Sequence, residues 1–121
     1  MDISQAIKKL KENPDFTENV GMLLIHNGVV RAWSRKDRSP VEFIDVSYDM
    51  AKIESLRLEY EQKPGIYKII IEVNSGRLTP GDDLLFIIVA GDIRENVKPV
   101  LADLLDRVKA EAVIKNEIFN I

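Results

Sequence analysis

Residues 84–108, LLFIIVAGDIRENVKPVLADLLDRV, determine the architecture of this chain. The first seven are all apolar, which predicts a strand buried on both faces at the centre of a sheet. In the remainder, apolar residues recur at i, i+3, i+4 and i+7, which predicts a long helix with one buried face. These residues are Val97, Val100, Leu101, Leu104, Leu105 and Val108. A central strand followed by an amphipathic helix predicts a domain in which helices pack on a sheet.

Shorter elements surround this unit. Helical spacing over residues 3–10 and 50–60 predicts two more helices, and runs of apolar and β-branched residues predict four more strands. The strands span 20–26, 41–47, 66–73 and 113–119, with Tyr67, Ile69, Ile71 and Val73 on one face of the third. Residues 28–40 are predicted as an exposed hairpin or loop, and residues 79–82 (TPGD) as a turn. The order αββαββαβ, with two apparent hairpins, predicts an α+β fold with helices packed on one mixed, mostly antiparallel sheet.

The composition limits the class of protein. The 121 residues are 45% hydrophobic and 31% charged, with a formal net charge of −3, so we expect one globular domain over residues 1–121. The chain has no cysteine and one histidine, which excludes disulfides, thiolate metal sites and a multi-histidine metal site within one chain. The negative charge argues against nucleic acid as a partner. The longest apolar run, residues 84–90, is too short to cross a bilayer, so we expect a cytoplasmic protein with no membrane association.

Four cations crowd into one predicted loop: Arg31, Arg35, Lys36 and Arg38. Guanidinium groups bind phosphate and carboxylate in a bidentate manner, although such a cluster is also typical of a solvated loop. Arg31 is the more specific candidate, because it follows a buried strand and Gly28 allows a close backbone approach. Trp33, the only tryptophan, indicates either a partner surface or a side chain folded onto the loop.

Three more cations and the only histidine are further candidates for a functional site. Arg94 lies near the start of the long helix, where free N–H groups attract anions, unless Asp92 caps the helix and Arg94 is only solvated. Lys109 closes the long helix and Lys115 lies in the last strand. A lysine in a cationic pocket has a lowered pKa and can act as nucleophile or general acid, whereas a lysine at a helix C-terminus also complements the helix dipole. His26 is interpreted as a packed histidine at the edge of the core.

Five segments, in this order, resemble the large (catalytic) subunit of molybdopterin synthase. They are an opening strand with Gly-x-Val-Arg (residues 21–31), an acidic residue and tyrosine before Met-Ala (45–51), a Gly-x-Leu-x-x-Gly-Asp turn (76–82), Lys109 after the long helix, and Lys-x-Glu at 115–117. The resemblance runs from about Val20 to Glu117.

The chain also departs from the family pattern. Asn74-Ser75 stand where the family has His-Arg, Ile93-Arg94 keeps only the arginine of a second His-Arg, and Ile114 replaces a tryptophan. Two alternatives to a working enzyme therefore stay open. One is a non-catalytic relative that keeps the fold and its partner surface. The other is a small phosphate- or nucleic-acid-binding module that uses the loop over residues 31–38.

The resemblance implies an α/β-hammerhead-like fold and a role in molybdenum cofactor biosynthesis. The implied reaction transfers sulfur from the thiocarboxylated C-terminus of a small ubiquitin-like subunit to cyclic pyranopterin monophosphate, forming molybdopterin. Lys109 and Lys115 would be catalytic, and Arg31, Arg94 and Lys115 would bind substrate, with no metal or organic cofactor. The implied partners are the small subunit and a second copy of the chain, which form a heterotetramer around a homodimer. The apolar strands 20–25 and 84–90 motivate the homodimer.

Overall fold

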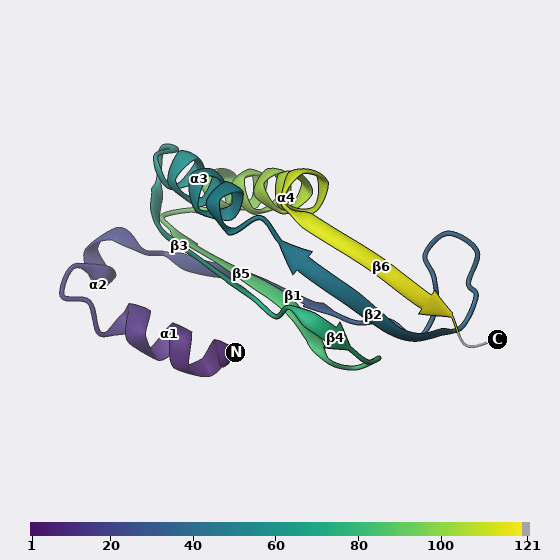
Figure 1. Cartoon of the computed structure of the whole chain (residues 1–121). Coiled ribbons are helices and arrows are strands. Elements are labelled where there is room, and N and C mark those ends of the chain that lie inside the picture. The colour runs from purple at the N-terminus through teal and green to yellow at the C-terminus, as the bar shows by residue number, and fades with distance from the viewer. Residues whose placement is uncertain (120–121) are drawn as a thin grey trace.

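The computed structural model describes residues 1–119 and contains two three-stranded antiparallel sheets (Figure 1). The first sheet has the order β1-β5-β3 and the second the order β4-β2-β6. In chain order the elements are α1 (Ile3–Lys11), α2 (Phe16–Asn19), β1 (Met22–Val29), β2 (Val41–Tyr48), α3 (Met50–Glu61), β3 (Ile66–Val73), β4 (Gly76–Leu78), β5 (Asp83–Gly91), α4 (Arg94–Glu111) and β6 (Val113–Phe119). The predicted α+β fold with helices packed on a sheet is confirmed.

The first sheet is the middle layer of a three-layer sandwich, with α3 and α4 on one face and α1 on the other (Figure 1). Its central strand β5 is buried from Leu85 to Gly91, as its continuous apolar run predicts. Leu85, Ile87 and Val89 face the two long helices, whereas Phe86 and Ile88 face α1. Alternate residues of one strand thus fill two separate cores.

The second sheet has its own small core, formed by Val30, Val41, Ile44, Val46 and Leu78. Tyr48, Leu84 and Val113 pack against both this cluster and the main core. The hydroxyl of Tyr48 donates a 2.9 Å hydrogen bond to the carbonyl oxygen of Leu84, and burial raises the pKa of Tyr48 to about 12. The junction between the sheets is therefore closely packed on one side.

Three predictions about the strands were wrong. The first predicted hairpin does not form, because β1 pairs with β5 while β2 pairs with β4 and β6. The long loop between β1 and β2 carries the chain from one sheet to the other, so the predicted single mixed sheet is two antiparallel ones. Strand β5 is also buried within the chain's own fold, so residues 84–90 cannot provide the dimer surface for which they were considered.

Sequence periodicity also missed three local features. Helix α2 is one turn long and β4 has three residues, both too short to show a period. In β3, an extra residue shifts the register between Ile66 and Lys68. Tyr67 consequently packs edge-on against Phe16 on the α1 side of the sheet, whereas Ile69, Ile71 and Val73 face α3 and α4 as predicted.

No described helix is long and apolar enough to span a membrane.

Candidate active site

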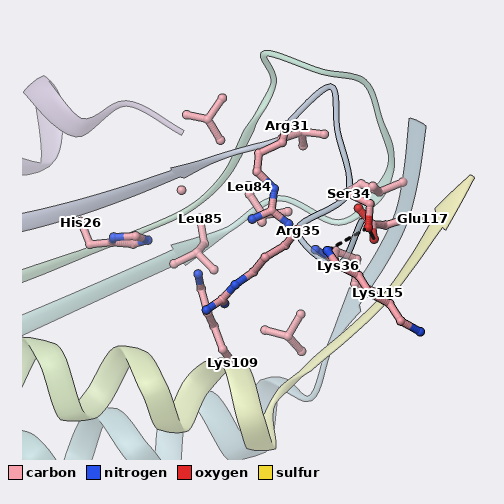
Figure 2. Close-up of a pocket in the computed structure, with 15 residues that line it drawn as sticks. His26, Arg31, Ser34, Arg35, Lys36, Leu84, Leu85, Lys109, Lys115 and Glu117 are labelled. Carbon is pink, nitrogen blue, oxygen red and sulfur yellow. Dashed lines mark hydrogen bonds between the residues drawn. The ribbon is translucent and has the colours of Figure 1, made fainter. Parts of the chain in front are cut away.

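A pocket of about 820 Å³ opens where the two sheets meet the end of α4 (Figure 2). The end of β1, the loop that follows it, the start of β5, the last turn of α4 and β6 all contribute to its walls. The lining residues are His26, Gly28, Val29, Val30, Arg31, Ser34, Arg35, Lys36, Ile44, Leu84, Leu85, Lys109, Val113, Lys115 and Glu117. Five of these side chains are arginine or lysine and one is a carboxylate, so the pocket is strongly cationic.

Helix packing orients Lys109 toward the pocket. Val108, the last residue of the buried stripe of α4, is fully inaccessible to solvent, and Lys109 follows it in the last turn. Figure 2 shows Lys109 and Arg35 directed toward one another across the pocket floor, with Arg31 above them. Two elements far apart in the sequence therefore bring cations into one cavity.

Lys115 reaches the same pocket from β6. Its pKa is lowered mainly because the pocket desolvates part of the side chain, and the charges of Arg31, Lys109 and Arg35 lower it further, while Glu117 opposes them. Arg31, Lys109 and Lys115, which the sequence analysis considered as site residues, thus line one cavity. The pKa of Lys115 is lowered, as we expect for a lysine in a cationic pocket.

The loop over residues 30–40 is held in place by its own side chains. The guanidinium carbons of Arg31 and Arg38 lie 5.1 and 3.9 Å from the ring centre of Trp33, so both contact the indole ring by cation–π interaction. Ser34 is buried, accepts a hydrogen bond from the backbone N–H of Lys36 and donates one of 3.2 Å to Glu117 of β6. The tryptophan is therefore folded onto its own loop, and the serine ties this loop to β6.

Arg94 lies elsewhere. It borders a shallow depression at the opposite end of the first sheet, together with Gly21, Met22, Asp92, Ile93 and Glu95. Its side chain is 77% exposed, and its Nε lies 3.6 Å from Glu95. Asp92 accepts hydrogen bonds from Ile93 N–H and from the Asn96 side chain, which lower its pKa. Within one chain, Arg94 therefore does not share a cavity with Arg31.

Three pocket residues were not selected from the sequence. Ser34 and Glu117 come from segments 83 residues apart, so nothing local indicates their hydrogen bond. His26, which the sequence predicts at the edge of the core, has its imidazole in the pocket wall (Figure 2). The one sequence pattern that indicates the position of His26 is the alternation of side chains along β1. His26 lies on the same face of the strand as Met22 and Leu24, but beyond the end of the helix that covers these two residues.

The site combines five cationic side chains, a loop that is held by hydrogen bonds and the imidazole of His26. Arginine and lysine side chains converging from separate elements are typical of sites that bind phosphate or carboxylate. Among residues 1–119, no group of three or more His, Cys, Asp or Glu side chains is placed to hold a metal ion. The arrangement can therefore bind a doubly anionic ligand and stabilise negative charge that develops on it.

The sequence model of the MoaE protein family matches residues 1–111. Comparison with the curated proteins finds no match.

Several solved structures share the fold. Molybdopterin synthase from Staphylococcus aureus superposes with a TM-score of 0.80 at 19% identity, covering 99% of this chain and 86% of that chain. A MoaE protein from Burkholderia ambifaria gives a TM-score of 0.74 at 23% identity, covering 99% and 81%. A complex of subunits 1 and 2 of molybdopterin-converting factor from Helicobacter pylori gives 0.74 at 15% identity, covering 99% and 80%. At these low sequence identities, the structural similarity supports a shared fold only. The match to the family model covers 111 of the 121 residues. The chain belongs to the MoaE protein family.

Proposed function

We propose that this chain is the large subunit of a molybdopterin synthase and acts in molybdenum cofactor biosynthesis. In the proposed reaction, sulfur passes from the thiocarboxylated C-terminus of a small ubiquitin-like subunit to cyclic pyranopterin monophosphate. Membership of the MoaE family supports the pathway, and the site chemistry supports the reaction.

One observation carries the proposal: Arg31, Lys109 and Lys115 line the same pocket although they come from a loop, a helix and a strand. Both reactants are anionic, one through its phosphate and the other through its thiocarboxylate. A cavity that collects positive charge on three elements, with only Glu117 to offset it, favours binding of both.

We assign two roles to these three cations. Arg31 and Lys115 bind the substrate phosphate through charge-assisted hydrogen bonds. Lys109, which lines the pocket together with Leu85, stabilises the negative charge that forms on the carbonyl oxygen of the tail during acyl transfer, or captures the tail covalently. Val29, Val30, Ile44, Leu84, Leu85 and Val113 supply the apolar part of the pocket wall, which strengthens these electrostatic interactions by excluding water.

The proposed assembly has two copies of this chain at its centre and one small subunit on each. The Helicobacter pylori complex supports a small-subunit partner. Strand β1 lies at an edge of the first sheet, and Ile25 on it is 37% exposed. Antiparallel pairing of two β1 strands would bring the Met22 end of one copy beside the Gly28 end of the other. A substrate contact by Arg94 requires such a second copy, because Arg94 lies beside Met22.

Reconstitution with the cognate thiocarboxylated small subunit tests the function. The unmodified chain is expected to form molybdopterin, and Lys109→Ala is expected to abolish transfer while the melting temperature stays nearly unchanged, because an exposed lysine contributes little stability. Lys98→Ala, an exposed lysine of the same helix outside the pocket, is the matched control and is expected to retain activity.

Three results would contradict this assignment. Near-normal turnover by Lys109→Ala would remove the catalytic role of the lysine. An inactive unmodified chain that still binds the small subunit would favour a non-catalytic relative. A salt-dependent shift with RNA or DNA would favour the nucleic-acid-binding alternative.

A further inference from the structure

The only histidine of the chain lies in the wall of the cationic pocket (Figure 2). Imidazole is the one ordinary side chain that exchanges a proton near neutral pH, and the chain has no cysteine to serve instead. This single group is therefore found where the proposed chemistry occurs. The inference below rests on the proposed function.

Strand geometry explains how His26 reaches the pocket. Met22, Leu24 and His26 share one face of β1, and the first two pack against the core beneath α4. Helix α4 ends shortly after Lys109, so the next side chain along β1 faces the cavity instead of the helix. His26 is in this way the polar continuation of a buried stripe.

The imidazole is held without a permanent hydrogen bond. Its Nε2 is buried and has no hydrogen-bond partner among the described residues. An ideal Cβ on Gly28 would lie 3.4 Å from this atom, so the absence of a side chain at position 28 leaves the nitrogen uncrowded on that side. An unpaired buried nitrogen costs about 1–3 kcal/mol, which a histidine kept only for packing would avoid.

The surroundings keep this histidine neutral. Burial lowers the pKa of His26 below its ordinary 6.5, and the charge of Lys109 lowers it further. The other charged groups around the pocket are Arg31, Arg35 and Lys36 from the loop and Lys115 and Glu117 from β6. Only Glu117 favours protonation. General base catalysis requires an imidazole in its neutral form, and a neighbouring ammonium can stabilise the negative charge that the reaction creates.

We propose that His26 is the general base that activates water in this pocket. In the proposed reaction, the thiocarboxylate sulfur displaces an oxygen leaving group from a substrate carbon, so a C–S bond replaces a C–O bond and a thioester joins substrate and tail. Water then attacks the carbonyl carbon as His26 accepts its proton; the new C–O bond forms and the C–S bond breaks. The proton passes from the imidazolium to the departing sulfur, so one thioester and one water give one carboxylic acid and one thiol. Lys109 stabilises the oxyanion.

The test compares His26→Gln and His26→Phe with the unmodified chain in single-turnover reactions with the thiocarboxylated small subunit. Loss of a general base is expected to slow hydrolysis of the thioester by about 100-fold or more. Glutamine keeps a hydrogen-bonding group but cannot accept the proton, so the thioester should accumulate as a small subunit–pterin adduct visible by mass spectrometry. Substrate binding should change little.

The pH dependence of the reaction rate distinguishes a catalytic role of His26 from a structural one. In the unmodified chain the rate is expected to fall as pH drops below the lowered pKa of His26, because the protonated imidazole is no longer a base; the glutamine variant should lack this limb. A glutamine variant with near-normal rate and the same acid limb would overturn the inference while leaving the proposed function intact. An unmodified chain that makes no molybdopterin would overturn both.

An NMR titration, which requires no turnover, tests whether the charge of Lys109 acts on His26. Because the chain has one histidine, its NMR titration is unambiguous, and Lys109→Gln is expected to raise the pKa of His26 by removing a like charge. An unchanged pKa in that variant would contradict the placement of the base beside the lysine.

Discussion

The ammonium group of Lys115 interacts with four other charged side chains. Arg31, Lys109 and Arg35 lower its pKa, in addition to the larger effect of burial, and Glu117 opposes them. A bound anion would relieve the repulsion among the cations. Binding of a phosphate should therefore draw the pKa of Lys115 back upward, which links anion affinity to pH.

Lys115→Gln removes one charged contact to that phosphate. A hydrogen bond to a charged group contributes about 1.5–3 kcal/mol, so inorganic phosphate and the pterin substrate should each bind roughly ten- to a hundredfold more weakly. In the unmodified chain, affinity should fall as pH rises through the lowered pKa of Lys115, since the neutral amine no longer attracts the anion. Calorimetric titrations across this pH range check both points. Equal affinities of the two proteins would exclude Lys115 from the binding site.

At the scale of elements, the loop over residues 30–40 shapes the pocket. It carries Arg31, Arg35 and Lys36 to the cavity and is joined to β6 by one side-chain hydrogen bond, from Ser34 to Glu117. Because Ser34 also accepts the Lys36 N–H, one hydroxyl holds both the internal turn and the contact with the strand.

Ser34→Ala should loosen this loop without unfolding the domain. Trypsin should cleave faster after Arg35 and Lys36, and the emission of Trp33, the single tryptophan, should shift as its ring leaves the two arginines. Substrate affinity should fall in parallel. The exposed Ser75→Ala is the control. Cleavage at the rate of the unmodified chain would show that the hydrogen bond does not hold the loop.

Individual elements show what the sequence could and could not predict. The continuous apolar run of β5 and the periodic stripe of α4 identify a buried strand and its covering helix, because both signals are local. The separation into two sheets depends on pairing between β2 and β6, which lie more than 60 residues apart. No local pattern encodes such pairing.

The residues of the candidate site also divide into those that local sequence predicts and those whose position depends on contacts between distant segments. Lys109 could be found because it follows the last residue of a buried helical stripe, and Arg31 because it follows a strand. The contact of Ser34 with Glu117 and the place of His26 in the pocket wall depend on where distant segments meet. The separation of Arg94 from Arg31 likewise depends on the direction in which β1 and β5 run.

At the scale of the whole molecule, Arg94 and Lys109 lie at opposite ends of α4, an 18-residue helix of about 27 Å. If both act on one substrate, the arginine must come from a second copy. A dimer made of one Arg94→Ala chain and one Lys109→Ala chain would then contain one intact site, formed by Lys109 of the first chain and Arg94 of the second.

Mixed dimers test this arrangement. Co-expressed and separately tagged variants, purified through both tags, are expected to regain activity that neither single-variant dimer shows. Light scattering at micromolar concentration is expected to give a dimer. A monomer, or mixed dimers as inactive as both parents while Arg94→Ala alone is impaired, would contradict a site shared between copies.

The central claim is that the pocket at the junction of the two sheets holds the pterin phosphate. A crystal structure of the unmodified chain with cyclic pyranopterin monophosphate tests it most directly. The phosphate is expected within hydrogen-bonding distance of Arg31 and Lys115, with the pterin carbons that receive sulfur facing Lys109 and His26. A substrate bound outside this cavity, with the pocket cations still facing solvent, would contradict the account.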